Sequence, residues 1–151
     1  MRATAARSAS SPRLASERSC VHSSTWKMAS QAPLSASQDD LVVTKAVVRA
    51  ATALGLSQRD LAAVVGLSEA SVSRLARGRP LSAARKEGEL ALLLIRVFRS
   101  LDALVGGDER KAREWFHADN AHLRGVPAER VRSVEGLVDV ASYLDAMRGH
   151  L

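Results

Sequence analysis

From residue 37 onward, apolar residues recur at intervals of three or four, and no segment alternates as a half-buried strand would. Residues typical of helix starts and stops divide this pattern into segments. The expected N-caps are Ser37, Ser57, Ser68, Ser82, Asp108 and Ser133, and the expected stops are Gly55, Gly66, Gly78 with Pro80, and Gly106 with Gly107. The sequence therefore predicts an all-α protein of about seven helices.

Three of these helices have a predicted apolar face. In the first helix it comprises Leu41, Val42, Ala46, Val48 and Leu54. In the last it comprises Val134, Leu137, Val138, Ala141, Leu144 and Met147. The longest helix, expected from Ser82 to Val105, has a stripe of Leu90, Leu94, Val97, Phe98, Leu101 and Leu104, with Leu93 and Ile95 off it. A helix that is apolar on more than one side is buried between layers. We expect it to join an N-terminal domain to a small helical C-terminal domain, although a shared dimer surface is a rival interpretation.

The segment Gln58–Arg77 has the spacing of a helix-turn-helix. Ala62 is small enough for two helices to cross closely, and Gly66 suits a turn with positive φ. The positions expected to point inward and fill the wedge between the helices are Leu61, Val65, Leu67, Val72 and Leu75. The alternative is an ordinary helical hairpin with a solvated basic face.

The residues left facing outward lie on the second helix and at its N-terminal end, the part that enters a major groove. Arg74 can bind guanine through two hydrogen bonds, and Glu69 can accept one from cytosine. Ser68 at the helix N-terminus suits a phosphate. The full predicted DNA-binding set is Gln58, Ser68, Glu69, Ala70, Ser73, Arg74, Arg77 and Arg79.

Charge and composition agree with this division. Of the 151 residues, bases outnumber acids by six, mainly in the first 36 residues and between Ser57 and Lys86, whereas acids outnumber bases after Ser100. A basic segment beside an acidic one indicates a polyanion-binding part next to a part with another use. The single cysteine, Cys20, excludes an intramolecular disulfide and a site with several thiolate ligands. No apolar run approaches the roughly 20 residues of a membrane span, so we expect a cytoplasmic protein without membrane contact.

Residues 1–36 are rich in Ser, Ala and Arg and show no apolar periodicity, so we expect a disordered tail. Two interpretations stay open for this tail. It has the composition of a mitochondrial transit peptide. Alternatively, the assigned start of translation lies too far upstream, and Met28 is the natural first residue. We prefer this second interpretation.

A second motif lies in the C-terminal part, at Trp115, Asn120, Leu123, Gly125, Pro127 and Gly136. We expect Trp115 to anchor a loop to the core and Asn120 to bond the backbone of its turn. Gly125 and Pro127 would fix a bend, and Gly136 would let another backbone approach the last helix. The histidines lack zinc-ligand spacing, and there is no nucleophile elbow or phosphate-binding glycine loop. We therefore expect no metal, no cofactor and no catalytic residues.

The helix-turn-helix segment resembles the Xre and Cro family of phage-type repressors. Together with the long helix and the loop motif, residues 37–151 resemble the Xre/MbcA/ParS-type antitoxins. That resemblance implies a non-enzyme that neutralises a cognate RES-domain toxin, which consumes NAD⁺, and that binds its own double-stranded promoter DNA, with a homodimer expected. It also implies a toxin-binding surface of Tyr143, Met147, Arg148, Gly149, His150 and Leu151.

The expected domains are therefore a tail at 1–36, a helix-turn-helix domain with its linking helix at 37–105, and a toxin-binding domain at 106–151. Two other functions are compatible with the sequence. A stand-alone helix-turn-helix regulator with a ligand-sensing C-terminal domain would contain an apolar cavity with convergent polar groups. A protein-interaction adaptor would have a helix-turn-helix that does not bind DNA.

Overall fold

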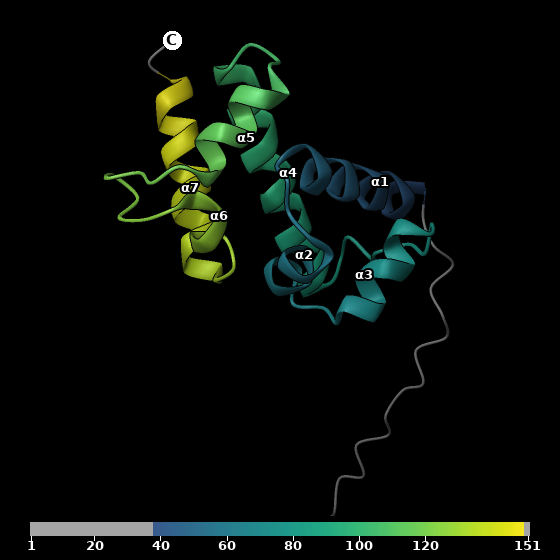
Figure 1. Ribbon diagram of the computed structural model, residues 1–151. Helices are drawn as coiled ribbons and strands as arrows, with labels where there is room; N and C mark the ends of the chain where they lie inside the picture. Colours follow the sequence, from purple (N-terminus) through teal and green to yellow (C-terminus); the bar gives the residue numbers. More distant parts are fainter. Residues whose placement is uncertain (1–37, 150–151) are drawn as a thin grey trace, which may run out of the picture. The chain divides into compact units, whose positions relative to one another are not determined.

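The computed structural model describes residues 38–149, and the predicted tail and the predicted cap Ser37 lie outside this range. These residues form seven helices and no strand, which confirms the all-α prediction. Figure 1 shows how the helices are arranged. The helices are α1 (Gln38–Ala53), α2 (Gln58–Val65), α3 (Glu69–Ala76), α4 (Lys86–Leu104), α5 (Glu109–His117), α6 (Pro127–Arg130) and α7 (Val134–Arg148). Among the described residues, no helix is both long and apolar enough to cross a membrane.

Helices α2 and α3 form the predicted hairpin, and local hydrogen bonds fix both starts. The Ser57 side chain accepts from the backbone of Asp60, whose carboxylate accepts in return from the Ser57 backbone, which is a complete capping box. Gly66 ends α2 with a φ of 70°, and the Ser68 side chain caps α3. The predicted wedge residues Leu61, Val65, Val72 and Leu75 and the crossing Ala62 are buried, and Leu67 is half-buried.

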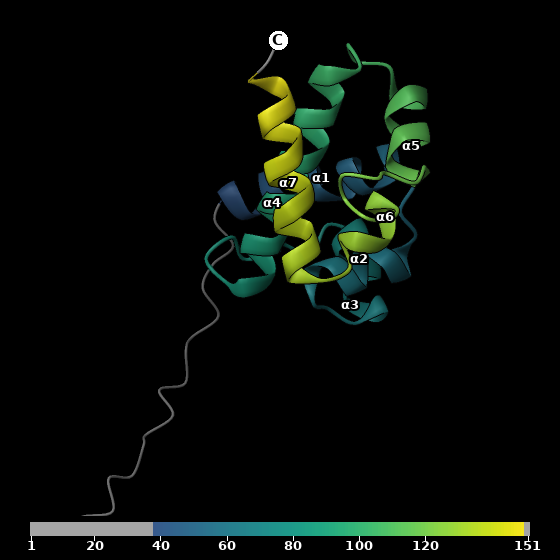
Figure 2. The ribbon, with the colours of Figure 1, turned by 90° about the vertical axis from the view of Figure 1, so that its left-hand side faces the viewer.

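Helix α4 is the centre of the fold. It packs against α1 and α2 and also against α7, so it contacts both halves of the described chain (Figures 1 and 2). The residues that it buries are Gly88, Ala91, Leu94, Val97, Ser100 and Leu101. The predicted role of this helix as the joining element is confirmed.

The predicted start of this helix is wrong, because α4 begins at Lys86 and not after a Ser82 cap. Two side chains of α1 hold the preceding segment in a non-helical path. The hydroxyl of Thr44 accepts from the Leu81 backbone at 2.7 Å, and the carboxylate of Asp40 accepts from the Ala83 backbone at 2.8 Å. Because their side-chain partners lie on α1, the Leu81 and Ala83 amides are fixed outside the helical path.

Two predicted apolar faces are also corrected. On α1, Leu41 and Val42 are exposed, and the buried face comprises Thr44, Val47, Ala50, Ala51 and Ala53. On α7, Val134, Val138 and Met147 are exposed, while Val140, which is not part of the predicted face, is fully buried. The buried face of α7 is therefore rotated from the predicted one, and comprises Gly136, Leu137, Val140, Ala141 and Leu144.

The loop between α5 and α7 contains a helix that the sequence analysis placed in a bend. Pro127 occupies the first turn of α6, where its missing amide hydrogen has no intrahelical partner to lose. Ser133 then caps α7 as predicted. A Cβ on Gly136 would lie 2.8 Å from the backbone carbon of Arg130, so the predicted close approach to the last helix is confirmed.

Candidate functional site

The predicted DNA-binding residues lie on α3 and around its ends, apart from Gln58, which begins α2. All of them are exposed except Ser73, which is half-buried. The Oγ of Ser68 accepts from the Ser71 amide at 3.3 Å, and the two hydroxyl groups lie 3.0 Å apart. The N-terminal end of α3 is thus ordered by its own side chains, as a helix end that enters a groove requires.

Arg74 is held along α3, because its Nε donates to the carbonyl oxygen of Ala70 at 3.1 Å. This bond uses one donor of the guanidinium, which has five. A side chain restrained in this way would lose less conformational entropy on binding a ligand through its terminal nitrogen atoms.

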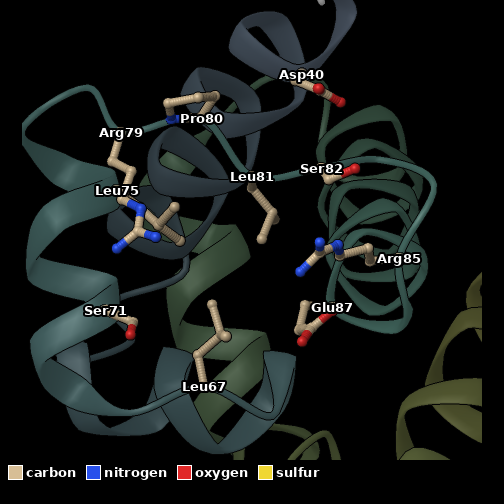
Figure 3. Close-up of a pocket in the computed structure, with 10 residues that line it drawn as sticks. All are labelled: Asp40, Leu67, Ser71, Leu75, Arg79, Pro80, Leu81, Ser82, Arg85 and Glu87. Carbon is tan, nitrogen blue, oxygen red and sulfur yellow. The ribbon is translucent and has the colours of Figure 1, made fainter. Parts of the chain in front are cut away.

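Arg79 lies at a cavity of about 340 Å³ beside α3 (Figure 3). The floor includes Leu67, Leu75 and Leu81, and Figure 3 shows the guanidinium of Arg85 across the cavity from that of Arg79. The sequence analysis missed Arg85, whose only signal was its basic charge just before α4. Arg85 thus adds a second basic group, beside Arg79, to the cavity next to α3.

In the C-terminal part, the predicted loop geometry is present. The side-chain oxygen of Asn120 accepts from the amides of His122 and Leu123, at 3.0 and 3.2 Å. Asn120 also exchanges two backbone hydrogen bonds with Gly125, which closes the loop. Leu123 is buried beneath it.

Three rings gather where this loop meets α7. The ring of Tyr143 stacks on Trp115 of α5 with a centroid distance of 6.2 Å, and on His122 of the loop with 5.9 Å. Tyr143 and Trp115 are half-buried, and His122 is exposed. Tyr143 therefore presents only part of its ring on the surface. The sequence analysis missed His122, because nothing local indicated that it would face a residue on α7.

Three of the other predicted toxin-binding residues lie at the end of α7. Met147, Arg148 and Gly149 are exposed, and His150 and Leu151 lie outside the described residues. The Nη1 of Arg148 donates to the hydroxyl of Ser100 at 3.3 Å. Ser100, which is fully buried on α4, donates in turn to Asp145 at 2.9 Å.

Arg96 of α4 completes this polar cluster through a salt bridge with Asp145. Partial burial raises the pKa of the Asp145 carboxyl, but the hydrogen bonds from Ser100 and Arg96 outweigh it, and the pKa is lowered. The carboxylate therefore stays charged and fixes the end of α7 against α4. The sequence analysis missed this cluster, whose members lie far apart in the chain.

A second ion pair connects the two halves. The Nη2 of Arg132, between α6 and α7, donates to Asp60 of α2 at 2.8 Å. The hydrogen bond from the Ser57 side chain lowers the pKa of Asp60 most, and the nearby charge of Arg132 lowers it further. The C-terminal part is thus attached to the helix-turn-helix beside the cap of α2. No cluster of His, Cys, Asp and Glu suited to a metal ion occurs among residues 38–149.

Comparison with known families gives two matches. The model of the antitoxin Xre-like helix-turn-helix domain matches residues 33–96. The model of the antitoxin Xre/MbcA/ParS C-terminal toxin-binding domain matches residues 100–149. No curated protein matches the chain. The two matches meet within α4, whereas the predicted boundary between 105 and 106 stays a prediction.

Proposed function

The chain belongs to the Xre-type antitoxins, and from this premise we propose that it neutralises a RES-domain toxin, which consumes NAD⁺, and represses its own operon as a homodimer. The DNA-binding and toxin-binding domains make it an antitoxin of a toxin–antitoxin system. The class of toxin, the promoter target and the homodimer are the proposed parts. They follow from the likeness to antitoxins whose toxin is of the RES type.

The proposed DNA contact is made by α3. Arg74 would contact a base edge, and Ser68 at the helix N-terminus would bind a phosphate. Arg79 would bind a neighbouring phosphate. Their exposure supports this assignment, because none of the three needs a change of fold to reach a groove.

The proposed toxin contact is made by the end of α7. Met147 is a large apolar side chain with 45% of its surface exposed, and such residues are favoured interface anchors. Arg148, five residues beyond Tyr143, is positioned by its hydrogen bond to Ser100. A protein that covers the toxin's active-site entrance with this end would prevent NAD⁺ from entering.

The observation that carries the proposal is that one unit has two separate exposed sites. Figures 1 and 2 place α3 and the C-terminal end of α7 at opposite ends of the described residues. DNA and toxin would therefore not compete for one surface. Such an arrangement suits a repressor that also inhibits an enzyme by binding it.

The experiment is co-expression with the toxin encoded beside this chain. Toxin alone should stop growth and deplete cellular NAD⁺, and the full chain should restore both. A variant lacking Arg148–Leu151 should fail to restore them while it still binds promoter DNA. Arg74→Ala should show the opposite pattern, with rescue kept and promoter binding weakened.

Two results would contradict the proposal. Toxin expressed alone that stops growth without depleting NAD⁺ would exclude the RES-type toxin. A chain that binds its promoter but has no toxin to bind would instead favour the regulator with a ligand-sensing C-terminal domain.

A further inference from the structure

Helix α4 has one face that no other described helix covers. Its outward positions, spaced alternately by three and four residues, are all exposed, and we call them the outer row: Glu89, Leu92, Arg96, Arg99 and Ala103. This is the spacing of a seam between two paired helices. The face combines an exposed leucine, at 45% of its surface, with charges of both signs.

Beside the outer row runs a groove of about 400 Å³ between α4 and the end of α7. Leu92, Ile95 and Ala103 supply its apolar lining, and Arg99 and Arg148 supply positive charge. The groove can receive a side chain that projects from an apposed helix. A face with a ridge and an adjacent groove suits helix-on-helix packing.

The charges of the outer row are arranged to complement a second copy of the same row. In an antiparallel pair with its twofold axis midway between Leu92 and Arg96, Glu89 of each copy faces Arg99 of the other. Leu92 then lies near the axis, against the aliphatic stem of Arg96 from the second copy. In a parallel pair, Glu89 would face Glu89 and Arg99 would face Arg99, and like charges directly opposed are unfavourable.

Arg96 does not disturb this complementarity, because Asp145 of its own chain already balances its charge. The two remaining charges, Glu89 and Arg99, have opposite signs and are equally far from the axis along the helix. Twofold symmetry would therefore form the same ion pair twice. Interfaces in symmetric dimers are self-complementary in this sense.

We propose that the outer row of α4 is the surface through which two copies of this chain pair antiparallel. The inference rests on the proposed homodimer and assigns a surface to it. A single pair of helices buries less than the roughly 1,600 Å² of a standard stable interface, so the dimer dissociates on dilution. No member of the outer row lies on α3 or lines the cavity beside it, so pairing through this row does not use the proposed base-contacting residues.

The test is a charge exchange in the full chain, read by sedimentation velocity over a wide range of concentrations. Glu89→Arg and Arg99→Glu, made singly, each replace two attractive pairs by two repulsive ones. Each should raise the dissociation constant of the dimer by at least about tenfold. The double variant, which restores the pairs in reverse, should dimerise again. Arg49→Glu, a charge reversal on an exposed position of α1, is the control and should dimerise as the unmodified chain does.

Four outcomes would overturn the proposal. A chain that stays monomeric at every concentration has no such dimer. A dimer that persists in both single variants uses another surface. Single variants that dissociate without recovery in the double variant exclude the antiparallel register. A monomeric chain that loses a co-expressed toxin on Arg99→Glu would assign the groove to that toxin. Since growth rescue and promoter binding are measured separately, the pairing can fail while the proposed function stands.

Discussion

The ring of Tyr143 lies nearly parallel to that of Trp115, with 13° between their planes and 6.2 Å between their centroids. This contact joins α7 to α5 across the loop that Asn120 orders. Aromatic pairs of this kind stabilise a fold beyond the area they bury. Tyr143 therefore holds the C-terminal part together, in addition to the role in toxin binding that we propose for it.

Tyr143→Asp should lower the free energy of unfolding by about 1–3 kcal/mol, because it removes the stack and places a charge among half-buried rings. Tyr143→Phe keeps the ring and should stay within about 0.5 kcal/mol of the unmodified chain. Urea denaturation of the two variants measures the difference. Equal stability of both would mean that the ring contact contributes nothing to the fold.

Met147 is the better position at which to test toxin binding. Because its side chain is well exposed, Met147→Asp should change the free energy of unfolding by no more than about 0.5 kcal/mol. The same variant should fail to rescue growth from the co-expressed toxin, since it puts a charge in the core of the proposed contact. Val134→Asp, at an exposed position on the first turn of α7, is the control and should rescue. Normal rescue by Met147→Asp would remove this residue from the interface.

Gly136 is required by the close approach of a neighbouring backbone. Gly136→Ala would place its Cβ 2.8 Å from the backbone carbon of Arg130. It should therefore lower the free energy of unfolding by at least about 1–3 kcal/mol. Gly149→Ala is the control, because the nearest atom to its Cβ lies at 3.5 Å, an ordinary contact. Denaturation midpoints compare the two. A stable Gly136→Ala variant would mean that α7 can move away from the turn before it.

Stability should fall in acid partly through Asp60. Its pKa is lowered in the folded chain, so its contribution is fully present above the ordinary value of 3.8 and is lost as the pH falls through the folded value. Asp60→Asn should be less stable at neutral pH by up to about 1 kcal/mol, because it weakens the pair with Arg132. The two melting temperatures should converge below pH 3.8. A difference that stays constant over the whole pH range would mean that the charge of Asp60 is not the cause.

Arg74 and Arg79 should affect promoter binding differently. Arg74→Ala should cost about 1–3 kcal/mol on the specific site and relax the preference at one base pair. Arg79→Ala should weaken all sequences alike and reduce the slope of the salt dependence by about one. Titrations of specific and scrambled duplexes at two salt concentrations separate these effects. Equal losses on both duplexes for Arg74→Ala would exclude a base contact.

The starts of α2, α3, α5 and α7 could be predicted because each depends on residues that are neighbours in sequence. Ser57, Ser68, Asp108 and Ser133 all cap helices through side-chain bonds that reach only two or three residues. The start of α4 could not be predicted by the same rule. It is set by Thr44 and Asp40, which bond backbone groups about forty residues away.

The candidate site likewise has a part that could be predicted from local sequence and a part that could not. The outward side of α3 follows from helical periodicity, and its residues are exposed as predicted. The cluster of Arg96, Ser100, Arg148 and Asp145 depends on how α4 and α7 pack, and a single sequence contains no signal for that pairing. On α7, half of the predicted apolar face is wrong, because Val134, Val138 and Met147 are exposed, whereas Leu137, Ala141 and Leu144 are buried as predicted.

Because α4 is one continuous helix, its length determines how the part of the chain after it is rotated about the helix axis relative to the part before it. One additional residue between Arg96 and Ser100 would turn the part beyond it by about 100° and move it by about 1.5 Å. Arg96 would then no longer face Asp145, and the end of α7 would point elsewhere relative to α3. Seven additional residues, close to two full turns, would leave a phase error of only about 20°. We therefore expect relatives of this chain to vary the length of α4 in steps of about two turns, and seldom by a single residue.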